Sequence, residues 1–206
     1  MKNRFMVVII FMFFPVFLLA TTLELDDHTI VKNVTQIEKQ LSDQNLTIFK
    51  GITIAKSNLS DVKKTLGEAV ITESGEAGSY LRKLCYFGDD GTTVLFESGE
   101  LGGPKADLDT VKIFPSLDKK QSKNCTNSKK INKDSAIIFG LKLDLSTKTV
   151  KKMLGKPSKE AKDRLIYYYH TVEKSKGETF DVCTTIELKI VKGKVTLIDF
   201  SKTETN

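Results

Sequence analysis

Histidine is scarce in this chain, because only His28 and His170 occur among 206 residues. A Ser-His-Asp or Cys-His catalytic system needs a positioned imidazole base, and these two residues are the only candidates. A zinc site needs three or four clustered imidazole, thiolate or carboxylate ligands, which two dispersed histidines do not supply. The inventory therefore predicts a protein that is not an enzyme and that uses no metal and no cofactor.

Long apolar runs are also few. The stretch Phe5–Ala20 is uncharged and apolar, follows Lys2 and Arg4, and is interrupted by Pro15. It is shorter than the roughly 20 residues of a membrane-spanning helix, so residues 1–20 read as a secretory signal peptide, with a retained anchor as the alternative. No cysteine lies near the end of this segment, which argues against lipid attachment there. We expect a secreted or periplasmic protein.

The positive charge of the chain is not spread over its surface. The net charge is +6, and the segment 118–134 alone holds six lysines against two aspartates. The rest is close to neutral and no aromatic residues alternate with the lysines, so we expect no nucleic-acid partner. The segment is either a solvated connector or a strip that docks to an anionic envelope component, such as phospholipid headgroups or cell-wall polymers.

Cysteine is limited to Cys85, Cys125 and Cys183. In an exported protein, three cysteines predict one disulfide and one remaining thiol, and three pairings are open. We favour Cys85–Cys125, which would tie the lysine-rich segment to the preceding part of the chain. A Cys125–Cys183 bond would tie it to the following part instead.

One sequence pattern occurs twice in the chain. Residues 51–67 read GITIAKSNLSDVKKTLG and residues 140–155 read GLKLDLSTKTVKKMLG. Five identical residues match at a constant offset of 88, from Val62 and Val150 to Gly67 and Gly155. A pattern of this length that occurs twice predicts a duplicated supersecondary unit.

Each copy predicts a short helix followed by three strands. Ser57 and Ser146 are candidate N-caps, while Gly67 and Gly155 stand where a left-handed residue would end the helix. Leu59, Val62 and Leu66 form one apolar stripe of the first helix. The predicted strands are 80–87, 92–97 and 109–114 after the first helix, and 164–170, 182–191 and 195–201 after the second.

The chain therefore predicts an α+β fold with two tandem α-β-β-β repeats, in which short helices cover each antiparallel sheet. The predicted organisation is a signal peptide (1–20), an N-terminal preface (21–48), repeat 1 (49–116), a lysine-rich linker (117–135) and repeat 2 (136–206). Within 182–191, the even-numbered residues from Val182 to Ile190 should share the buried face.

The second copy resembles a known family. Its string L-S/T-x-x-x-V-K-x-x-L-G-x-P, followed by a tyrosine-rich strand between Leu145 and Tyr169, is similar to the SmpA/OmlA-type domain of the outer-membrane assembly lipoprotein BamE. Two such units in tandem resemble the β-lactamase-inhibitor-protein architecture. The resemblance implies a non-catalytic bacterial binding module, because some members inhibit enzymes and others support outer-membrane assembly. The chain lacks the lipid-attachment cysteine of the assembly lipoprotein.

Aromatic residues give the candidate binding site. Alternation puts Tyr167 and Tyr169 on one face of their strand and Tyr168 on the other, and tyrosine is frequent at interaction hot spots. These rings either line a binding surface or pack the sheet. The candidate partner-binding residues are Tyr167, Tyr169, His170, Tyr80 and Tyr86.

The function predicted from these observations is a secreted or periplasmic protein-binding module, with an enzyme inhibitor as one form and with a protein partner of unknown identity. The alternative is a structural or assembly factor of the cell envelope that docks through the basic linker.

Overall fold

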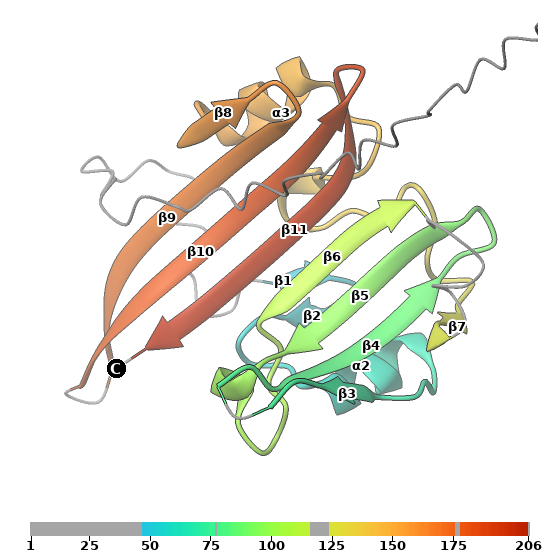
Figure 1. Ribbon diagram of the computed structural model, residues 1–206, viewed down its shortest axis with the longest axis vertical. Coiled ribbons are helices and arrows are strands. Elements are labelled where there is room, and N and C mark those ends of the chain that lie inside the picture. Colours follow the sequence, from blue (N-terminus) through green and yellow to red (C-terminus); the bar gives the residue numbers. More distant parts are fainter. Residues whose placement is uncertain (1–46, 77, 116–123, 176–177, 206) are drawn as a thin grey trace, which may run out of the picture.

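A computed structural model of the chain describes residues 47–76, 78–115, 124–175 and 178–205 (Figure 1). The predicted signal peptide, the preface up to residue 46 and the linker residues 117–123 lie outside this range. Within it, no helix is both long enough and apolar enough to cross a membrane.

The described residues contain two α-helices, α2 (Leu59–Leu66) and α3 (Thr147–Leu154), and two short 3-10 helices, η1 (Glu100–Gly102) and η3 (Ile138–Gly140). The strands in chain order are β1 (Thr47–Phe49), β2 (Ile52–Thr53), β3 (Thr72–Ser74), β4 (Leu81–Phe87), β5 (Thr92–Ser98), β6 (Thr110–Pro115), β7 (Thr126–Asn127), β8 (Lys159–Ala161), β9 (Arg164–Ser175), β10 (Glu178–Val191) and β11 (Lys194–Thr205). We call residues 47–115 the first half and residues 136–205 the second half.

The prediction of an α+β fold with two helix-covered sheets was wrong. The described residues are mostly β, and nine strands form one large sheet in the order β3-β4-β5-β6-β11-β10-β9-β8, with β7 beside β4. The expected sheets merge because β6 pairs antiparallel with β11, from Ile113 with Ile198 to Thr110 with Ser201. The helices have only eight residues each and cannot cover the sheet. They lie behind its two outer parts, while β1, β2 and loops lie behind the rest (Figure 1).

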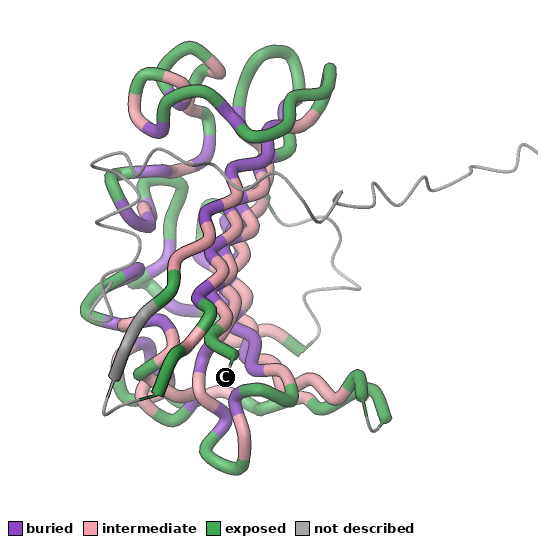
Figure 2. Tube along the Cα trace, turned by 90° about the vertical axis from the view of Figure 1, so that its left-hand side faces the viewer, coloured by how far each residue is buried: buried purple, intermediate pink, exposed green. Residues whose placement is uncertain are grey.

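One hydrophobic core runs behind the whole sheet. It joins residues of both halves, including Tyr86 and Phe96 from the first and Tyr167 and Phe200 from the second. The even-numbered residues of β10 from Val182 to Ile190 are buried and their odd neighbours are not, which confirms the predicted alternation. The short strands β3, β7 and β8 belong to the sheet itself. In the view turned by 90°, most of the described chain outside the sheet lies on one side of it (Figure 2).

The two helices occupy equivalent sequence positions, because Leu59 and Thr147 are 88 residues apart, as are the helix ends. Leu59, Val62 and Leu66 are buried, as the stripe predicted. The first N-cap is Asn58 rather than Ser57. The Asn58 side chain accepts hydrogen bonds from the backbone N–H groups of residues 60 and 61, and the Ser57 hydroxyl accepts one from Thr53 N–H instead.

The predicted Cys85–Cys125 disulfide is present, and it spans 40 residues. It holds β7 against the outer side of β4, where Tyr86 pairs with Thr126 and Phe87 with Asn127. Cys183 is free and half-buried on β10.

Candidate functional site

The open face of the sheet is the side that no described helix or strand covers. Its register places side chains in rows across six neighbouring strands. One row runs from Cys85 through residues 95, 112, 199 and 187 to Ile166, and the next from Lys83 through residues 97, 110, 201 and 185 to Tyr168. Side chains from distant parts of the chain therefore meet on one surface.

Two of the predicted binding tyrosines belong to the core instead. Tyr86 and Tyr167 are 0% and 1% exposed. The Tyr86 hydroxyl donates to the carbonyl of Gly67 at 2.7 Å, and the Tyr167 hydroxyl donates to that of Gly155 at 3.3 Å. Each tyrosine thus ties the C-terminal end of a helix to the sheet, which gives a buried ring a partner for its polar end.

The environment of both tyrosines favours the neutral phenol. Burial, helped by the carboxylate of Glu68, raises the pKa of Tyr86 to about 12. Burial, helped by Glu160, likewise raises the pKa of Tyr167 to about 12.

The other predicted residues are divided between the two faces. Tyr169 is also buried, so it is not a surface contact residue. Tyr80 is half-buried beside β4, with the Arg82 guanidinium 5.0 Å from its ring centre. His170 lies on the open face, where its Nε2 is 3.0 Å from Asp181. Its neighbour Tyr168, half-buried on the same face, has its hydroxyl 3.3 Å from the sulfur of Cys183.

A band of six charged side chains, which we call the charged row, crosses the middle of the open face, and the carboxylates of Asp199 and Glu187 are neighbours within it. Lys112 Nζ is 3.1 Å from both Glu97 and Asp199, and therefore joins the two halves across the β6–β11 pair. Lys83 contacts Glu97 from the outer side at 3.4 Å, and Arg164 contacts Glu187 at 3.3 Å. Three cations face three carboxylates, so this part of the face has no net charge.

The central charges of this row are partly removed from water. Burial raises the pKa of the Asp199 carboxyl, although Lys112 acts in the opposite direction. Burial alone would lower the pKa of Lys112, but the carboxylates of Asp199 and Glu97 outweigh it and raise the pKa. The charges of these ion pairs therefore partly compensate one another.

Next to the charged row lies an apolar patch that the sequence reasoning missed. Phe87 and Phe114 flank Thr93 in the same row, and Leu95 lies in the next row. Phe87, Leu95 and Phe114 are half-buried. The alternation within 80–87, 92–97 and 109–114 was the available signal, because it separates Phe87, Leu95 and Phe114 from the buried residues of the same strands. We call these three residues the aromatic patch.

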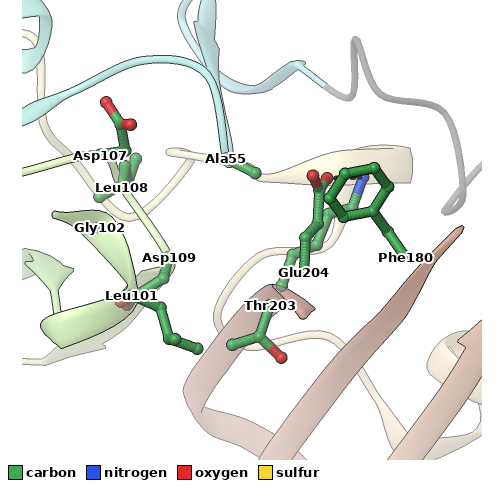
Figure 3. Close-up of a pocket in the computed structure, with 10 residues that line it drawn as sticks. Ala55, Leu101, Gly102, Asp107, Leu108, Asp109, Phe180, Thr203 and Glu204 are labelled. Atoms are coloured by element: carbon green, nitrogen blue, oxygen red, sulfur yellow. Dashed lines mark ion pairs between the residues drawn. The ribbon is translucent and has the colours of Figure 1, made fainter. Parts of the chain in front are cut away.

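On the core side, a pocket of about 320 Å³ opens between the η1 loop and the ends of β10 and β11 (Figure 3). Lys202 and Glu204, which form an ion pair at 3.5 Å, lie on its β11 side. Its lining contains neither histidine nor cysteine. In the part of the chain that the structure describes, no three His, Cys, Asp or Glu residues are grouped so that they could hold a metal ion.

The described end of the lysine-rich segment is fixed to the first half. Ile131 is buried, and the Ser128 hydroxyl donates to the carbonyl of Leu66 at 3.2 Å. Lys129, Lys130 and Lys133 are exposed. This end is therefore held in place rather than free to act as a connector.

Comparison with protein-family models, with curated proteins and with solved structures finds no match for this chain. The similarity to SmpA/OmlA-type domains therefore stays a prediction.

Proposed function

We propose that this protein is an exported, non-catalytic binding module that receives a protein partner on the open face of its sheet. A disulfide and the lack of a membrane-spanning helix among the described residues are compatible with a secreted or periplasmic protein. Disulfides persist in such oxidising compartments.

The observation that carries the proposal is the aromatic patch beside a neutral row of paired charges. Protein-binding surfaces combine a central group of aromatic and apolar side chains with a polar surround. The rows of the open face have this composition, with Phe87, Leu95 and Phe114 at one end and the charges from Lys83 to Arg164 beside them. An enzyme inhibitor is one form of such a module.

The test uses the mature protein as bait for cross-linking and mass spectrometry in native envelope and culture supernatant. We expect Phe87→Ala combined with Phe114→Ala to abolish capture of a partner, because truncating a hot-spot aromatic residue costs about 2 kcal/mol or more of binding free energy. Val191→Ala is the matched control, since Val191 is an exposed apolar residue away from the patch. Circular dichroism checks that both variants fold.

The proposal predicts that wild type and Val191→Ala capture the same partner, which the double variant loses. Capture by all three proteins alike would contradict it.

A second candidate function is an envelope factor that docks through the lysine-rich segment. The observation in its favour is that Lys129, Lys130 and Lys133 are exposed on a segment fixed by the disulfide and by Ser128. Docking through exposed charges predicts release from membranes in about 0.5 M salt, where screening acts within a few ångströms. Binding through the aromatic patch predicts association that such salt leaves intact.

A further inference from the structure

The two outer edges of the sheet are not equally protected. β4 is accompanied on its outer side by β3 at residues 81–83 and by β7 at residues 86–87. β9 is accompanied by β8 only at residues 164–166, although β9 continues to Ser175. Beyond that, the Ser158 hydroxyl accepts a hydrogen bond from Tyr168 N–H, and no other described strand follows β9 on this side.

Two hydrogen bonds in the N-terminal part of β9 and just before it show which of its backbone groups point outward. The carbonyl of Asp163 accepts from Ile190 N–H, so odd-numbered residues face β10. Tyr168 N–H faces Ser158, so even-numbered residues face the outer edge. His170 and Val172 therefore direct their backbone N–H and C=O groups away from the sheet, where an added strand could bond them.

This edge also lacks the usual protection against pairing. Natural edge strands are kept apart by lysine, proline, bulges or short length. Residues 165–172 read LIYYYHTV and contain no lysine and no proline. Val172 is 56% exposed at the edge. The register with β10 runs without a bulge from residue 164 to residue 175.

We propose that β9 pairs with β9 of a second copy of this chain, antiparallel about a two-fold axis at Thr171. In this register His170 faces Val172 of the other copy, and Thr171 faces Thr171. Both His170 and Val172 have outward-facing backbone groups, so the pairs exchange hydrogen bonds as in any antiparallel ladder. A two-fold contact needs a self-complementary surface, which an antiparallel strand provides.

The backbone groups along the edge fit this register. Ser158 already bonds Tyr168 N–H, so the pairing centres on His170 and Val172, the next two outward-facing residues. An axis at Thr171 sets these two residues opposite each other. The dimer would extend the sheet of one copy into that of the other, and it would leave the aromatic patch at the opposite end of the sheet uncovered (Figure 1).

The test measures the oligomeric state of the mature protein by sedimentation equilibrium over a range of concentrations. We expect a monomer–dimer equilibrium whose dissociation constant rises about tenfold or more in Val172→Lys, because a charge at an edge opposes strand pairing. Val172→Pro should act likewise, since it removes an N–H that faces outward and therefore leaves the β9–β10 bonds intact. Val191→Lys, the same substitution at another exposed valine, should keep the wild-type constant.

Amide hydrogen exchange supplies a second measurement on the same samples. The amide of Val172 should become protected as the dimer forms, while that of Thr171 is protected in monomer and dimer alike. A wild-type protein that stays monomeric at its highest soluble concentration would overturn the proposal, as would a dimer that both Val172 variants leave unchanged. The proposal does not depend on the partner of the open face, and its failure would leave that function untouched.

Discussion

The first and second halves carry equivalent helices but secure the sheet in different ways. In the first half, the outer strand β4 has seven residues, is flanked by β3 and β7, and is closed by the Cys85–Cys125 disulfide. In the second half, β9 to β11 have 12 to 14 residues, the outer edge is followed by three residues of β8, and Cys183 is free. The first half is stabilised by a covalent bond, and the second by longer strand pairing.

This difference indicates that two similar helix sequences can pack against parts of a sheet whose edges are protected in different ways. Both halves use a tyrosine to bind the glycine carbonyl after the helix, so the contact between helix and sheet is common to the two. The edges differ because they depend on segments outside the matching sequence, namely the cysteine-bearing segment before β7 and the length of β9.

The largest effect should come from breaking the disulfide. Cys85→Ser combined with Cys125→Ser frees a 40-residue loop in the unfolded state, which should lower the free energy of unfolding by about 3–4 kcal/mol. Urea unfolding monitored by circular dichroism measures it. Cys183→Ser is the control and should change stability little, because this thiol lies half-buried on the open face. If Cys183→Ser lowered the stability as much as the double variant does, the disulfide would not distinguish the first half from the second.

A smaller and more symmetrical effect is expected from the two buried tyrosines. Tyr86→Phe and Tyr167→Phe should each cost about 1 kcal/mol of stability, since each removes one hydrogen bond to a helix end. Tyr86→Phe should cost more, because its bond is 2.7 Å long against 3.3 Å. Tyr80→Phe, which removes a hydroxyl from a half-buried ring, is the control. A cost for Tyr80→Phe as large as for the others would refute this reading.

The same tyrosines predict how stability depends on alkaline pH. Their pKa of about 12 in the folded protein lies above the ordinary value of 10. The folded state therefore holds these protons when the unfolded state has lost them, so stability present below pH 10 is lost as the pH rises towards 12. Urea unfolding between pH 10 and 12 should show that the free energy of unfolding falls with pH, and this fall should be smaller in Tyr86→Phe and in Tyr167→Phe. An unchanged fall in both variants would contradict the raised pKa values.

The smallest difference should separate the two helix N-caps. Asn58 forms a reciprocal capping box with Asp61, whereas Ser146 accepts a single backbone bond from Thr149. Asn58→Ala should therefore cost about 1–2 kcal/mol and Ser146→Ala about 1 kcal/mol. Thermal or urea unfolding of the two single variants measures this order. The reverse order would indicate that the second helix depends more on its cap than its hydrogen bonds suggest.

The candidate site was only partly predictable. Alternation correctly separated Tyr168 from Tyr167 and Tyr169, but it could not show which set faces the core. Apolar residues lie on both sides of β9, with Leu165 beside Tyr167 and Ile166 beside Tyr168. Helix α3 settles the question, because Gly155 at its end offers a carbonyl that the Tyr167 hydroxyl reaches.

The sequence by itself determined the local features of this protein: both helices with their terminal glycines, the buried face of β10 and the β-rich runs, while it favoured one disulfide but left three pairings open. These depend on residue spacing and on turns within a few positions, where the backbone restricts the choices. Only the tertiary structure decided that two expected sheets are one, that three tyrosines are buried, and that the aromatic patch and the Lys112 charges share an open face. Those outcomes rest on the pairing of β6 with β11, which joins residues more than 80 positions apart, and no local pattern encodes it.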